Sequence, residues 1–128
     1  MPLTLEDKSH IYDQIVAIVK DNIPEDFTVL EQPDRITVDT HKPVVIEGRK
    51  RDSLNLLSVI VQKNHIGFYF MPVYVEPQMR ESLSQPLDKM LKGKSCFIVK
   101  RELTPEMKDE VASLVRTGVA LYQEREWI

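Results

Sequence analysis

The sequence predicts an α+β fold, a two-layer sandwich in which an antiparallel sheet of five to six strands packs against N- and C-terminal helices on one face. Three observations support this prediction. Apolar residues recur at helical spacing at both ends of the chain, and the middle consists of short β-branched and aromatic runs. The gaps between these runs are too short for crossover helices, so neighbouring strands must run antiparallel.

The N-terminal helix is predicted to begin after Thr4, which can cap it together with Asp7. It should end before Pro24, because a proline nitrogen has no hydrogen to donate to a helical hydrogen bond. One face of this segment is apolar at helical spacing and is expected to pack on the sheet: Ile11, Ile15, Ile18, Val19 and Ile23.

The strands are predicted from runs rich in β-branched and aromatic residues, which cover 27–31, 35–40, 43–50, 53–64 and 65–75. Turn-forming residues separate them: Pro33 and Asp34, His41 to Pro43, Gly48 with its charged neighbours, and Lys63 with Asn64. These runs should form the greater part of a meander within a single domain, 1–128.

After the meander, one or two helical turns are predicted over 76–83, followed by a short helix that Ser84 caps and Gly93 ends. A further strand is expected over 95–100. Thr104 and Pro105 then open the last helix. Its apolar face comprises Met107, Val111, Leu114, Val115, Gly118 and Tyr122.

The second face of the predicted sheet should be polar, yet several strands lack the expected alternation. An apolar or aromatic strip is therefore expected there. Either residues 77–92 fold over this strip, or central strands simply have mixed faces, or the strip meets a second subunit or lines a ligand groove. The candidate ligand or interface residues are Ile60, Tyr69, Met71, Lys94 and Cys96.

The stretch Gly93-Lys94-Ser95 matches only the end of a phosphate-binding loop. The full motif needs a glycine five residues earlier, where this chain has Asp88, and it runs from strand to helix rather than from helix to strand. Nucleotide binding is thus not expected. For Cys96, the only cysteine, a packed core thiol is favoured over a nucleophile.

Charge and composition narrow the classes of function. The net charge is −3, which argues against nucleic-acid binding. No apolar run is long enough to span a bilayer, so no membrane association is expected. A single cysteine fits a reducing compartment, and a cytoplasmic location is expected. No cofactor is expected, and no acid–base–nucleophile set can be assembled, so an enzyme is not predicted.

The function predicted from these residues is a non-enzymatic domain that binds a protein partner or a small ligand through the second sheet face, with a homodimer as one form. An anion-binding module is the alternative that the basic residues Lys92, Lys94, Lys100 and Arg101 leave open.

Several blocks of the sequence, "PEDFTVLE", "HIGFYFMPVY", "LKGKSCFIVKR" and "ALYQEREW", resemble the YdhG-like family of small bacterial proteins, a domain of unknown function. The resemblance implies a frataxin-like α-β5-α fold. It also implies an alternative function, a frataxin-like iron chaperone that uses an acidic surface. The positions that match such a surface are Asp13, Asp21, Glu25, Asp26 and Glu31, with Lys20 among them, and no metal site is assigned.

Overall fold

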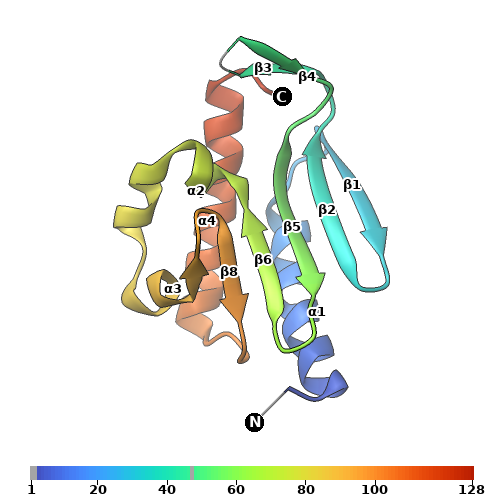
Figure 1. Ribbon diagram of the computed structural model, residues 1–128, viewed down its shortest axis with the longest axis vertical. Coiled ribbons are helices and arrows are strands. Elements are labelled where there is room, and N and C mark those ends of the chain that lie inside the picture. The colour runs from blue at the N-terminus through green and yellow to red at the C-terminus, as the bar shows by residue number, and fades with distance from the viewer. Residues whose placement is uncertain (1–2, 47) are drawn as a thin grey trace.

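The computed structural model describes residues 3–46 and 48–128 of the chain. It has two layers, with helices α1 (Leu5–Asn22) and α4 (Pro105–Glu124) side by side behind a six-stranded antiparallel sheet (Figure 1). The α+β sandwich predicted from the sequence is thereby confirmed. Among the described residues, no helix combines the length and the apolar character that crossing a membrane requires.

Both long helices begin at the residues that the sequence predicts. The Thr4 hydroxyl accepts a hydrogen bond of 3.0 Å from the backbone N–H of Asp7, whose carboxylate accepts one from the N–H of Thr4. Likewise, the Thr104 hydroxyl accepts a hydrogen bond from the N–H of Met107, and Pro105 occupies the first turn of α4. These caps fix where each helix starts, and therefore which side chains face the sheet.

The strands of the sheet lie in the order β1-β2-β5-β6-β8-β7. Their bounds are β1 Phe27–Gln32, β2 Arg35–Thr40, β5 Asn55–Val61, β6 Ile66–Phe70, β7 Leu91–Lys92 and β8 Cys96–Val99. The register aligns Ile36, Val59, Phe68 and Phe97 in one row across four strands, and all four are buried. The core therefore lies between this face and the two long helices.

A separate two-stranded hairpin is inserted between β2 and β5. The turn predicted at Gly48 is confirmed, since Gly48 has a φ of +78° and lies between β3 (Val44–Ile46) and β4 (Arg49–Arg51). The charged residues after Gly48 were expected in the turn, but they form β4, so the run predicted over 43–50 contributes to two strands. We call β3, β4 and the turn between them the hairpin arm. At its base, the N–H of Thr40 donates to the carbonyl of Leu54, and the Thr40 hydroxyl accepts a hydrogen bond from the N–H of Leu54. The hairpin arm stands at one end of the molecule, close to the C-terminus (Figure 1).

The prediction of a strand over 65–75 is correct as far as Phe70 and wrong beyond it. Residues Met71–Val75 form the short helix α2, with Pro72 in its first turn. Pro72 has no N–H to donate to a neighbouring strand, so the ladder cannot continue through it. Val73 consequently packs in the core, and Met71 does not share a sheet face with Tyr69.

Residues 77–92 do not cover the second face of the sheet. The 3₁₀ helix η1 (Pro77–Ser82) and α3 (Gln85–Met90) lie beside the β7–β8 edge (Figure 1). The N–H of Ser84 donates a 2.8 Å hydrogen bond to the carboxylate of Glu110 on α4, and Leu87 is buried in the core. This segment therefore turns toward the helical layer, which excludes the alternative that it folds over the strip.

The prediction that Gly93 ends the short helix is wrong. Helix α3 ends at Met90, and Leu91–Lys92 pairs with β8 as strand β7. Gly93 has a φ of +69°, the left-handed conformation that was expected of it, but it lies in the tight turn between β7 and β8. The Gly-Lys-Ser stretch is thus a β-hairpin turn rather than a helix terminus.

Candidate functional site

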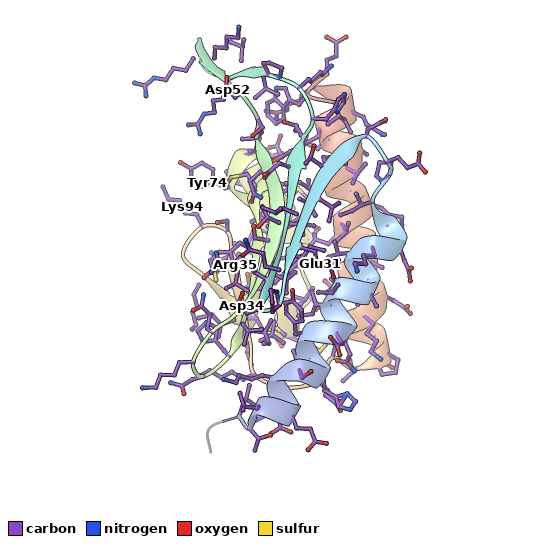
Figure 2. The ribbon with its side chains drawn as sticks, turned by 90° about the vertical axis from the view of Figure 1, so that its right-hand side faces the viewer. Glu31, Asp34, Arg35, Asp52, Tyr74 and Lys94 are labelled. Carbon is purple, nitrogen blue, oxygen red and sulfur yellow. The ribbon has the colours of Figure 1, made fainter. Side chains whose placement is uncertain are left out.

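The second face of the sheet is left open by the described elements, and we call it the open face. Strand register places Thr37, Ser58, Tyr69 and Cys96 in one row. The adjacent row contains Arg35, Ile60, Gly67 and Ile98. Figure 2 shows the sheet edge-on, with both long helices on one side and Arg35 toward the other. The apolar strip expected on this face is therefore present, and it centres on Ile60, Tyr69, Cys96 and Ile98.

Tyr69 lies across its own strand rather than standing out from it. A Cβ atom added to Gly67 would come within 2.8 Å of Cε2 of the Tyr69 ring, so the ring rests against the glycine backbone. The Tyr69 hydroxyl accepts a hydrogen bond of 3.1 Å from the side-chain amide of Gln62. The Tyr69 ring is thus held flat against the strand on the open face.

Cys96 lies on the open face beside Tyr69, which corrects the prediction of a thiol in the core. Its side chain is half-buried and is hydrogen-bonded to that of Tyr69, its cross-strand neighbour. Burial raises the pKa of the thiol, and the Tyr69 hydrogen bond only partly opposes this effect. At neutral pH the sulfur therefore remains protonated, a poor nucleophile.

Lys94 is placed in the β7–β8 turn, away from the strip. Its ammonium group lies 5.6 Å from the centre of the Tyr74 ring, within the range of a cation–π contact (Figure 2). The two side chains border a hollow of about 420 Å³ that Arg80 also lines. Arg80 is already bound to Asp88 at 2.9 Å, whereas Lys94 contacts the Tyr74 ring and forms no ion pair with any described residue.

Met71, the remaining candidate, lines a different hollow beneath the hairpin arm. This arm pocket has a volume of about 470 Å³, and the described residues that line it come from four separate stretches of the chain: Val45, Arg51, Leu54, Met71, Tyr74, Val75, Arg125 and Trp127. Sequence reasoning missed the pocket because no local pattern joins these stretches. The signal that was available in the sequence is the lone tryptophan, Trp127, two residues after Arg125.

The basic residues proposed for anion binding do not converge. Lys92 and Lys94 lie at the β7–β8 turn, whereas Lys100 and Arg101 follow β8 at its other end. The acidic positions are no more focused, because Glu31 is bound to Lys20 at 2.9 Å and Asp21, Glu25 and Asp26 are exposed. Within the described part of the chain, no three histidine, cysteine or acidic residues group closely enough to hold a metal ion.

Comparison of the chain with protein families, with curated proteins and with solved structures found no match in any of the three. The resemblance to the YdhG-like family, and the iron-chaperone role that it implies, therefore stay predictions.

Proposed function

We propose that the protein is a non-enzymatic binding domain that associates with a second copy of itself through the open face. The observation that supports this proposal is the apolar strip of Ile60, Tyr69, Cys96 and Ile98, which the described elements leave uncovered. An apolar strip rimmed by polar side chains is typical of an association surface.

The charges at the rim favour a second copy over an unrelated partner. Arg35 and Asp39 lie at opposite ends of β2 and face the same side of the sheet. A two-fold axis near Thr37, between them, brings Arg35 of one copy opposite Asp39 of the other, and the same contact then forms twice. The open face is in this sense electrostatically complementary to itself.

The described residues assemble no catalytic set, and this supports a binding role. The Cys96 thiol has a raised pKa, which disfavours its reactive form. The three histidines are also dispersed, since His10 lies on α1, His41 follows β2, and His65 precedes β6. A cytoplasmic location is part of the proposal, and the support for it is that the chain has a single cysteine.

Light scattering and sedimentation across a range of concentrations test the proposal. We expect a dimer, and we expect Ile98→Glu to weaken it at least tenfold because a carboxylate would be buried in the contact. Ala120→Glu places the same charge on the exposed side of α4 and serves as the matched control. A chain that stays monomeric at every concentration, with Ile98→Glu indistinguishable from Ala120→Glu, would refute the proposal.

A charge exchange then tests the symmetry. Arg35→Glu alone and Asp39→Arg alone each place like charges opposite one another, and each should favour the monomer. An equimolar mixture of the two variants restores both contacts and should dimerise. If the mixture dimerises no more than each variant does alone, the two-fold arrangement is wrong.

A further inference from the structure

The arm pocket is bounded by three parts of the fold that lie far apart in the sequence. The hairpin arm and the residues after it supply Val45, Arg51 and Leu54. Helix α2 supplies Met71, Tyr74 and Val75, and the segment after α4 supplies Arg125 and Trp127. None of these residues belongs to the apolar strip, so the pocket is separate from the proposed dimer contact.

The size and lining of the pocket suit a small organic molecule. Its volume of about 470 Å³ falls within the range of roughly 300–1,000 Å³ that is usual for ligand pockets. Apolar and aromatic side chains form most of the wall, whereas the charged groups among the described lining residues are two arginines and no carboxylate. Such a lining favours a ligand with an apolar body and a negative charge.

One side of the pocket is fixed before any ligand arrives. The Trp127 ring is buried and packs edge-on against Tyr122, with 5.0 Å between ring centres. The Arg125 guanidinium lies 5.4 Å from the centre of the Trp127 ring and is hydrogen-bonded to the carboxylate of Glu76 at 3.0 Å. Groups held in this way lose little conformational entropy when a ligand binds.

Arg51 provides the charge that is not already compensated. It is exposed on β4, and among the described residues it forms no ion pair. Arg125, by contrast, is neutralised by Glu76. A planar guanidinium matches a carboxylate group with two parallel hydrogen bonds, so Arg51 is the group expected to contact an incoming acid.

We propose that the arm pocket binds a small monocarboxylate with an aromatic or branched apolar body. The carboxylate contacts Arg51 from the hairpin arm, and the apolar body lies between Met71, Tyr74 and Trp127. This inference does not rest on the proposed dimer, because the pocket is formed within one chain.

Trp127 makes the test direct, since it is the only tryptophan in the chain and lines the pocket. The probes are phenylacetate, 3-phenylpropionate and 4-methylvalerate, each paired with its uncharged amide and titrated while tryptophan fluorescence is recorded. We expect a saturable change with at least one acid, and binding at least tenfold weaker for the corresponding amide. The absence of saturation with all three acids, or equal affinity for acid and amide, would overturn the proposal.

Arg51→Gln should weaken binding of the acid at least tenfold and leave binding of the amide unchanged. Arg49→Gln removes the same charge from the same strand at a residue outside the pocket lining, and it should bind like the parent chain. Thermal unfolding of both variants checks that the fold is retained. Equal affinities in the two variants would refute the role of Arg51. The titration is repeated with Ile98→Glu, whose unchanged binding would separate the pocket from the open face.

Discussion

The hydroxyl group of Tyr122, near the end of α4, donates a hydrogen bond of 2.8 Å to the backbone carbonyl of Asn55 at the start of β5. The tyrosine ring is fully buried and packs against both Phe27 and Trp127. One side chain thus joins the helical layer to the sheet at the end of the molecule where the arm pocket lies.

Replacing Tyr122 with phenylalanine should keep the packing and leave the Asn55 carbonyl without this donor. We expect the free energy of unfolding to fall by about 1–2 kcal/mol. Urea denaturation followed by circular dichroism measures the change. Tyr74→Phe removes a hydroxyl from an exposed ring and should alter stability by less than about 0.5 kcal/mol. If the two variants lose the same stability, the buried hydrogen bond contributes nothing specific.

The stability of the protein should decrease at alkaline pH. Burial raises the pKa of Tyr122 well above its ordinary value of 10.0. The unfolded chain therefore releases this proton first, and the stability contributed by the protonated group is lost as the pH rises above about 10. In Tyr122→Phe the decline should be shallower. Part of the alkaline loss of stability should remain in this variant, because burial also raises the pKa values of Tyr12 and Tyr69. Urea midpoints of the parent chain and of Tyr122→Phe are measured between neutral and strongly alkaline pH. Parallel pH dependence of the two midpoints would show that Tyr122 does not contribute to the decline.

Gly118→Ala should destabilise the protein although alanine favours helices. A Cβ atom at Gly118 would come within 2.7 Å of both Cζ of Phe70 and Cγ of Pro72. A buried phenyl ring and a proline ring cannot easily move aside, so a loss of about 1–3 kcal/mol should outweigh the helix-propensity gain of about 1 kcal/mol. Ser113→Ala, at an exposed position of α4, serves as the control and should be neutral or slightly stabilising. An increase in the melting temperature of Gly118→Ala would contradict the contact.

Alkylation of Cys96 should be slow at neutral pH. Burial raises the pKa of the thiol, so the rate of reaction with iodoacetamide should reach its midpoint at a higher pH in the folded chain than in the urea-unfolded chain. Tyr69→Phe removes the hydrogen bond that lowers this pKa and should move the midpoint higher still. A midpoint that coincides in the folded and unfolded chains would show that the thiol is not shielded.

The elements with strong local signals could be predicted from the sequence. Thr4 and Thr104 mark helix starts through their own side chains, and the alternation in 35–40 indicates strand β2 without any knowledge of its neighbours. Both kinds of signal can be read from a few consecutive residues. For this reason the layered architecture and the apolar strip on the open face could be predicted from the sequence.

One error passed over a local signal, and the others arise where a distant partner decides the conformation. An apolar run such as 66–75 fits a strand or a helix by periodicity, and Pro72 was the sign that the strand could not continue. The end of α3 at Met90 depends on the pairing of Lys92 with Cys96, which no helix-ending rule contains. The arm pocket is the extreme case, since its walls meet only after the sheet and α4 have packed.

The hairpin arm is closed at its base by the two hydrogen bonds between Thr40 and Leu54, and β2 and β5 are neighbours in the sheet without it. A shorter connection could therefore join these strands and keep their register, at the cost of the buried Val44. The part of the proposed pocket that the hairpin arm supplies, Val45 and Arg51, is in this way separable from the segments that form the sheet. The hairpin arm can therefore be redesigned or removed while the sheet and its helices keep their arrangement.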